Sequence, residues 1–209
     1  MKEESVSVKQ GKKALFYLIV QYQTDKIEAE RTIQMGNGNR GNIMIIKNGL
    51  VFTPEGKFEK KDLYVEGEYV AKETTDNKEV EAEGCYVIPG LVDIHFHGCV
   101  RHDMCDGTEE SIQALADYEA ANGVLAICPA TMTIPEEELF QAMKAAKEHK
   151  NGKGADLVGI NMEGPFINKE KKGAQKEEDI KLADIELFHK LQEAAGGLIK
   201  LVDLAPETE

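Results

Sequence analysis

Two histidines stand one residue apart at the end of an apolar stretch, in the segment IPGLVDIHFHG that spans residues 88–98. The part from Leu91 to Phe96 is typical of a buried strand, and alternate residues of a strand face the same side. His95 and His97 are therefore expected to point together at the carboxyl end of a strand, where α/β folds place their active sites. Two neutral imidazoles this close favour a divalent metal such as zinc or iron. An exposed pair that binds nothing is the alternative that the spacing alone leaves open.

Two acidic residues could complete such a site. Glu163 ends a later apolar segment, NMEGPF, just before a Gly-Pro turn, where a carboxylate suits metal binding or acid–base chemistry. Asp93 lies two residues before His95, so we expect it on the same face, orienting a histidine ligand without touching the ion. A lone glutamate at a strand end is also often a cap or a salt-bridge partner, and Asp93 could equally be a turn residue. Glu163 and the histidine pair together, in one series of strands, favour a metal site.

A lysine-rich loop follows Glu163. The segment NKEKKGAQ spans residues 168–175 and carries three lysines, at positions 169, 171 and 172. In an acidic chain this local positive charge could attract an anionic substrate. A solvated loop without a ligand is the alternative. Of the other histidines, His149 and His189 are interpreted as structural or surface residues, while His102 lies close enough to the histidine pair to remain a candidate.

The elements that must position these residues alternate along the chain from residue 85 onward. A helix is expected over residues 108–123, because Thr108 can cap its start and Gly123 its end. A second is expected over 135–150, which opens with proline and three glutamates, and a third over 182–195, where apolar residues have helical spacing. Continuous apolar strands lie between these helices. This alternation favours an α/β fold with a parallel sheet covered by helices.

The first part of the chain has a different pattern. Residues 44–85 alternate in polarity between NG, PEG and EGE turns, which predicts a small antiparallel sheet. Residues 34–42 are polar and rich in Gly and Asn, like a linker. Met44 resembles a natural start, so we interpret residues 1–43 as an extension that is disordered or not native. A genuine N-terminal extension is the alternative.

Composition excludes several functional classes. The 209-residue chain has a formal net charge of −13 and a pI near 4.9, which disfavours binding to nucleic acid. Its longest early apolar run, residues 14–20, is too short to span a membrane. The four cysteines form no C-x-x-C motif and are expected as reduced thiols in a cytoplasmic protein. They are Cys85, Cys99, Cys105 and Cys128.

Five segments in this order resemble one family: PGLVDIHFHG, HDMCDGT, CPATMT, GINMEGPFINKEKKGAQ and LAPE. Together they are similar to the N-acetylglucosamine-6-phosphate deacetylases of the amidohydrolase superfamily, over residues 44–209. The resemblance implies a (β/α)8 barrel of TIM type. Residues 86–209 would form about its first four βα units, and residues 44–85 part of a small antiparallel β-domain that precedes it.

The resemblance also implies a site and a reaction. His95, His97 and Glu163 match metal ligands, for one or two ions of zinc or iron, and Gly173 and Ala174 match a loop that touches the sugar phosphate. The reaction would hydrolyse the acetamide of N-acetylglucosamine 6-phosphate, giving glucosamine 6-phosphate and acetate. For the complete enzyme the resemblance implies a homodimer, with no membrane or nucleic-acid partner.

This chain differs from the family in its length. The family's catalytic aspartate and two later metal-binding histidines are expected beyond residue 209, so no catalytic residue is assigned here. We therefore expect a truncated form of the enzyme. One alternative is a non-catalytic fragment that needs a partner chain. Another is a different amidohydrolase of the deaminase or dihydroorotase type, which Glu163 argues against, because many of those enzymes use a carboxylated lysine in its place.

Overall fold

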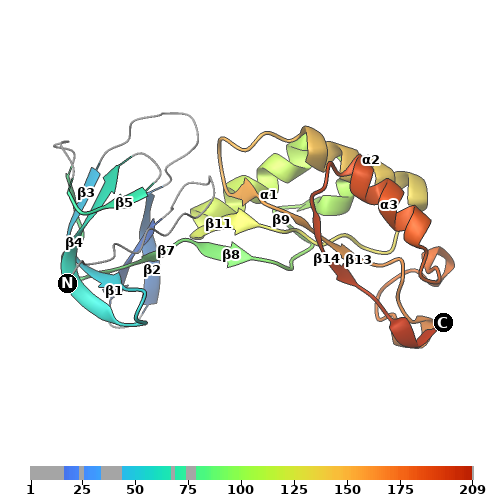
Figure 1. Ribbon diagram of the computed structural model, residues 1–209, viewed down its shortest axis with the longest axis horizontal. Helices are drawn as coiled ribbons and strands as arrows, with labels where there is room; N and C mark the ends of the chain where they lie inside the picture. Colours follow the sequence, from blue (N-terminus) through green and yellow to red (C-terminus); the bar gives the residue numbers. More distant parts are fainter. Residues whose placement is uncertain (1–16, 24–25, 34–43, 67–68, 74–78, 209) are drawn as a thin grey trace, which may run out of the picture.

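The protein consists of an N-terminal β-sheet joined to a layer of parallel strands that carries three helices (Figure 1). The structure, a computed structural model, describes residues 17–23, 26–33, 44–66, 69–73 and 79–208. The chain is therefore a mixed α/β protein, as the alternation of its segments predicts. Within these residues, no helix is both long enough and apolar enough to cross a membrane.

The N-terminal sheet has seven strands, in the order β2-β1-β7-β3-β4-β5, with β6 paired to β3. Their bounds are β1 (Tyr17–Gln23), β2 (Lys26–Ile33), β3 (Met44–Phe52), β4 (Phe58–Glu66), β5 (Tyr69–Ala71), β6 (Glu79–Glu81) and β7 (Cys85–Pro89). One face covers a small core of its own, formed by Ile46, Val51, Leu63, Val65, Ala82, Cys85 and Val87.

This sheet differs from the antiparallel sheet expected for residues 44–85. Strand β3 runs antiparallel to β4 but parallel to both β6 and β7. Hairpin turns can specify only antiparallel neighbours, and these two pairings join strands that are distant in the sequence. The sheet is therefore mixed.

Residues 1–43, interpreted from the sequence as a disordered or non-native extension, contribute two of the strands. Strand β1 pairs antiparallel with β7, from Tyr17↔Pro89 to Gln21↔Cys85, and β2 pairs with β1. This pairing satisfies backbone groups on the edge of β7 that β3 leaves open. The Gly- and Asn-rich segment at 34–42 lies outside the described residues. That residues 1–43 are not native stays a prediction.

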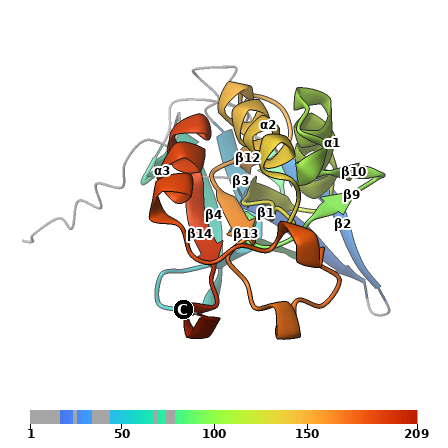
Figure 2. The ribbon, with the colours of Figure 1, turned by 90° about the vertical axis from the view of Figure 1, so that its right-hand side faces the viewer.

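The second unit contains the parallel strands. Strand β11 lies between β8 and β12, and β13 pairs with β14 (Figures 1 and 2). An isolated bridge, Ala130↔Asn161, connects the two groups. The bounds are β8 (Leu91–Asp93), β11 (Val124–Ile127), β12 (Asp156–Leu157), β13 (Ile160–Glu163) and β14 (Ile199–Asp203), with a small hairpin of β9 (Gly98–Cys99) and β10 (His102–Asp103).

Three helices cover one side of these strands: α1 (Glu109–Ala121), α2 (Glu136–Glu148) and α3 (Ile185–Ala194) (Figure 2). Each confirms a predicted helix. The Thr108 side chain caps α1 by accepting from the Ser111 N–H. The third helix starts three residues later than expected, because Asp184 caps it through the N–H groups of Glu186 and Leu187. Short 3-10 helices complete the unit: η1 (Met104–Asp106), η2 (Lys169–Lys171), η3 (Glu177–Asp179) and η4 (Pro206–Thr208).

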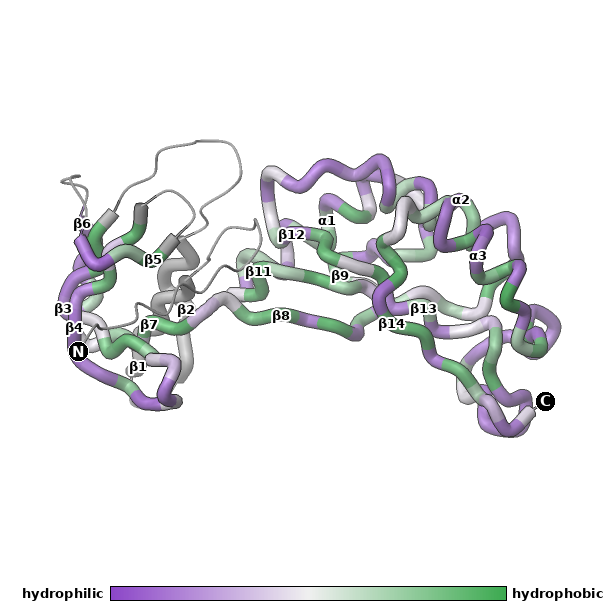
Figure 3. The backbone as a smooth tube through the Cα atoms, viewed as in Figure 1, coloured by the Kyte–Doolittle hydropathy of each residue, from purple (hydrophilic) through white to green (hydrophobic). Residues whose placement is uncertain are grey.

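The main core lies between the helices and the strands. It includes Ile127 and Met162 from the strands and Ile112, Met143 and Leu191 from the helices. Figure 3 shows β8 and β11 as mainly hydrophobic segments. Because this core is separate from that of the N-terminal sheet, each unit buries its own apolar surface.

Candidate metal centre

Three side chains that the sequence singles out converge at the ends of the parallel strands. Nε2 of His97 lies 3.2 Å from Oε2 of Glu163, and Nε2 of His95 lies 3.4 Å from the same oxygen. One ligand atom from each residue lies within 4.8 Å of the other two. The side chains are 47%, 36% and 24% exposed, for His95, His97 and Glu163 in that order, so an ion can reach them from solvent.

Main-chain hydrogen bonds to residues 130–131 hold the histidine segment on one side and the Glu163 segment on the other. The predicted strand Leu91–Phe96 is too long, since β8 ends at Asp93. Main-chain pairing continues nevertheless, because the Ala130 N–H donates to the Phe96 oxygen at 2.7 Å. On the other side, the Thr131 N–H donates to the Asn161 oxygen at 3.0 Å. Segments that end in His97 and Glu163 are thus held on both sides of residues 130–131.

The three donors fit a divalent cation such as zinc. Imidazole nitrogens and carboxylate oxygens bind zinc at about 2.0–2.2 Å, which in a tetrahedron places neighbouring ligand atoms about 3.4 Å apart. The separations of the two histidine Nε2 atoms from Glu163 Oε2 are 3.2 and 3.4 Å. The sequence prediction that His95, His97 and Glu163 come together is borne out by this geometry, whereas their role as ligands stays a prediction.

Asn161 is the first residue near the centre that the sequence did not assign. It lies two residues before Glu163 on β13, and its side chain is buried. Nδ2 lies 2.9 Å from Nδ1 of His95 and donates to the main-chain oxygen of Ile94 at 3.3 Å. Side chains two residues apart on a strand lie on the same face, so the sequence could have placed Asn161 beside Glu163.

Gln175 is the second unassigned residue. It is 4% exposed, and its Nε2 donates to Oε1 of Glu163 at 2.7 Å. The residue belongs to the lysine-rich segment 168–175, but an uncharged amide in a loop carries no spacing signal. The contact therefore emerges only from the fold.

Asp93 acts on the backbone of the histidine segment. Its Oδ1 accepts from the His95 N–H at 3.0 Å, and its carboxylate is not part of the cluster of metal-ligating groups. Such a turn holds the chain where it leaves β8. The prediction that Asp93 orients a ligand is compatible with this contact, which orients the main chain of His95 rather than its ring.

Gly173 and Ala174 lie on the exposed part of the loop between η2 and η3. Gly173 has φ +57°, and a Cβ there would meet nothing within 4 Å. Lys172 closes the loop by donating from Nζ to the Gln175 oxygen at 3.1 Å. The exposed residues Gly173 and Ala174 are thus followed directly by Gln175, the buried residue whose amide contacts Glu163.

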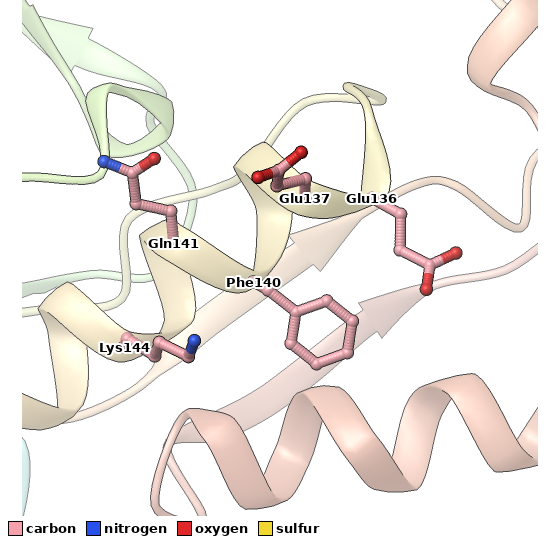
Figure 4. A pocket seen from close by; sticks show the side chains of 5 residues that line it. All are labelled: Glu136, Glu137, Phe140, Gln141 and Lys144. Atoms are coloured by element: carbon pink, nitrogen blue, oxygen red, sulfur yellow. The ribbon is translucent and has the colours of Figure 1, made fainter.

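The remaining histidines lie outside the cluster. Nδ1 of His102 is 3.2 Å from the Ser111 hydroxyl, at the start of α1. His149 caps the end of α2, and His189 is exposed on α3. A surface pocket over α2 is also separate from the centre, because its lining contains none of the proposed ligands. Figure 4 shows that lining, which is Glu136, Glu137, Phe140, Gln141 and Lys144.

Known proteins resemble this chain over most of its length. No family model matches it. The N-acetylglucosamine-6-phosphate deacetylase of Bacillus subtilis is 35% identical over 171 residues, which are 79% of this chain and 42% of that protein. The N-acetylgalactosamine-6-phosphate deacetylase of Escherichia coli O157:H7 is 27% identical over 168 residues, 79% of this chain and 45% of that protein. The chain spans less than half the length of these relatives.

Solved structures give the same result for the fold. The N-acetylglucosamine-6-phosphate deacetylase of Pasteurella multocida superposes with a TM-score of 0.68 at 21% identity, covering 78% of this chain and 44% of that one. A D267A mutant of the Mycobacterium smegmatis enzyme, in complex with N-acetyl-D-glucosamine-6-phosphate, gives 0.66 at 21% identity over 80% and 44% of the two chains. The resemblance inferred from the five motifs is confirmed.

Proposed function

Because this chain is similar to N-acetylglucosamine-6-phosphate deacetylases, which are enzymes, we propose that it supplies part of the metal centre of such a deacetylase. The reaction is hydrolysis of the acetamide of N-acetylglucosamine 6-phosphate, giving glucosamine 6-phosphate and acetate. The observation that carries this proposal is the convergence of two histidine nitrogens on one oxygen of Glu163.

His95, His97 and Glu163 would hold the ion, zinc or iron, with the two Nε2 atoms and Oε2 of Glu163 already close to one another. A bound ion of this kind polarises a carbonyl group and makes water a better nucleophile at neutral pH. Glu163 also offsets part of the positive charge of the ion. One or two ions would occupy the complete centre.

The substrate binds beside these ligands. Gly173 and Ala174 contact the sugar phosphate from the exposed loop, and the lysines of that loop favour the approach of its phosphate. No described aspartate joins the metal-ligating cluster. From the resemblance to the family, the group that moves the proton from water to the leaving amine is expected outside the described residues, as are further metal ligands.

We propose that residues 86–209 form about the first four βα units of a (β/α)8 barrel. The two outer strands, β8 and β14, each pair with a single described neighbour. Large apolar side chains are exposed at both strands: Leu91, Val92 and Ile94 at β8, and Val202 and Leu204 at β14. Further βα units would cover these edges.

The units that complete the barrel belong either to a longer chain or to a partner chain. The relatives are more than twice as long as the matched region, which supports this view. The complete enzyme is proposed to be a cytoplasmic homodimer. Residues 44–85 contribute to the small β-domain beside the barrel.

The first test is metal content and acetate release by the purified protein, loaded with zinc or ferrous iron. Wild type is compared with Glu163→Gln, and Glu170→Gln serves as a control in the exposed loop. N-acetylglucosamine 6-phosphate and its galactosamine isomer are offered separately, because a relative is named for each sugar. Metal that binds to wild type and Glu170→Gln but not to Glu163→Gln supports the centre.

Activity and metal binding answer different questions. Bound metal without acetate release supports the ligand set and indicates that the remaining barrel units are needed. Acetate release that disappears in Glu163→Gln shows that these 209 residues suffice. Wild type that binds neither metal contradicts the proposed centre.

A further inference from the structure

We propose that Gln175 is a positioning residue that orients Glu163, so that one carboxylate oxygen is reserved for the metal ion. The inference rests on the proposed metal centre and adds a residue from the substrate loop to it. Gln175 donates from Nε2 to Oε1 of Glu163 at 2.7 Å, while the two histidine nitrogens face Oε2.

The orientation of the Gln175 amide is fixed by a main-chain donor. The Thr133 N–H donates to Oε1 of Gln175 at 2.6 Å. A backbone N–H cannot accept, so the amide oxygen must face Thr133 and the amide nitrogen must face Glu163. Gln175 is 4% exposed, which leaves little water to compete for either bond.

This hydrogen bond limits the rotation of the Glu163 carboxylate. Tilting the carboxylate away from this orientation, so that both oxygens face the ion, would break the bond to Gln175 and leave a buried amide donor without its acceptor. The same Nε2 lies 3.6 Å from Sδ of Met132. Neutral hydrogen-bond partners of metal ligands orient the ligand in this way in other metalloproteins.

Gln175 also joins the metal centre to the loop that is proposed to contact the substrate. The main-chain N–H of Gln175 donates to the main-chain oxygen of Lys172 at 3.0 Å. The main-chain oxygen of Gln175 accepts from Nζ of Lys172 at 3.1 Å. Gly173 and Ala174 lie between these two residues. A ligand that moves this loop would therefore act on Glu163 through the Gln175 side chain.

The test is zinc affinity, measured by competition with a coloured chelator. Gln175→Met keeps the length and apolar body of the side chain but removes both amide functions. Gln192→Met is the matched control, because Gln192 likewise bonds to a main chain N–H and oxygen, those of Ile199, but lies on α3. We expect Gln175→Met to weaken zinc binding by about 10- to 100-fold and Gln192→Met to leave it unchanged.

The absorption spectrum of the cobalt-loaded protein gives a second readout, because it reports the coordination geometry. Gln175→Met should change this spectrum, whereas a purely structural role would leave it as in wild type. Wild-type zinc affinity and an unchanged spectrum in Gln175→Met overturn this inference alone. Absence of metal binding in wild type overturns the proposed centre as well.

If Gln175→Met does not fold, a measurement on wild type still tests the inference. Circular dichroism checks the helix content of both variants. In wild type, the side-chain amide protons of Gln175 should exchange slowly with solvent, and their chemical shifts should change when zinc binds. Rapid exchange with no shift change on zinc binding would contradict the proposed contact with Glu163.

Discussion

Nδ2 of Asn161 lies 2.9 Å from Nδ1 of His95, so a buried amide on β13 contacts the ring of a proposed ligand on a neighbouring segment. The same Nδ2 donates to the main-chain oxygen of Ile94. One side chain thereby holds both the ring and the backbone of the histidine segment. Glu163, two residues along, then faces Nε2 of the same ring.

Asn161→Ala should loosen His95 and destabilise the fold. Loss of the amide leaves the Ile94 oxygen unpaired, so we expect about 1–3 kcal/mol lower free energy of unfolding and about tenfold weaker zinc binding. Urea titration and chelator competition measure the two effects. The control is Asn168→Ala, whose amide bonds to exposed Glu207. Equal zinc affinity in both variants would show that Asn161 is not needed to hold His95.

Alanine should be tolerated less well at position 164 than at position 173. Both glycines have positive φ, +73° and +57°, and the left-handed conformation costs alanine about 1–2 kcal/mol. At position 164 the new methyl group would also meet the side chain of Thr133, whereas at 173 it meets nothing within 4 Å. We expect Gly164→Ala to lose about 1–3 kcal/mol more than Gly173→Ala in urea titrations. Similar losses would mean that Thr133 moves aside freely.

His149 should make the fold less stable at mildly acidic pH. Burial lowers its pKa below the ordinary histidine value of about 6.5, against weaker opposing effects of Glu109 and Asp156. Between the pKa of the folded chain and that of the unfolded chain, His149 is protonated only in the unfolded chain. The stability present above pH 6.5 is therefore lost as pH falls through the folded pKa. His149→Gln should flatten the dependence of unfolding free energy on pH across this range. The same substitution at exposed His189 controls for the loss of a histidine, and an unchanged slope in His149→Gln would contradict the prediction.

Cys105 should react slowly with alkylating reagents in the native protein. Burial raises the pKa of its thiol from 9.0 to about 12, and its Sγ accepts from the Met132 N–H at 3.1 Å. The thiolate is the reactive form, and the raised pKa leaves much less of it at neutral pH than in the unfolded chain. Mass spectrometry after timed iodoacetamide treatment measures the rate, with the urea-unfolded protein as reference. Equal rates at Cys105 in the two states would show that the thiol is not protected.

Helices were the most predictable part of this fold, because their signals are local. Thr108 accepts from a free N–H group at the start of α1, and three glutamates in the first turn of α2 complement the dipole of that helix. His95, His97 and Glu163 were predictable for a related reason. Strand ends in a parallel layer meet at one edge, so the position of each residue at or just beyond the end of a strand was enough.

Long-range contacts set the limit of prediction from sequence. The parallel pairing of β3 with β7 depends on strands that no turn connects directly. The roles of Asn161 and Gln175 depend on partners 66 and 12 residues away. The sequence alone does not indicate which distant group an uncharged amide will contact. The end of β8 at Asp93 was missed because a side chain that bonds to the main chain competes with continued strand.

The distance along the chain between His97 and Glu163 gives the proposed ion a further consequence. An ion held by both closes a loop of 66 residues (163 − 97) that contains α1, α2 and β11. It would thus act as a reversible cross-link between distant parts of the polypeptide, and the free energy of metal binding would add to the free energy of folding. The folding equilibrium would then depend on the concentration of free ion, and a lower concentration would leave more of the chain unfolded.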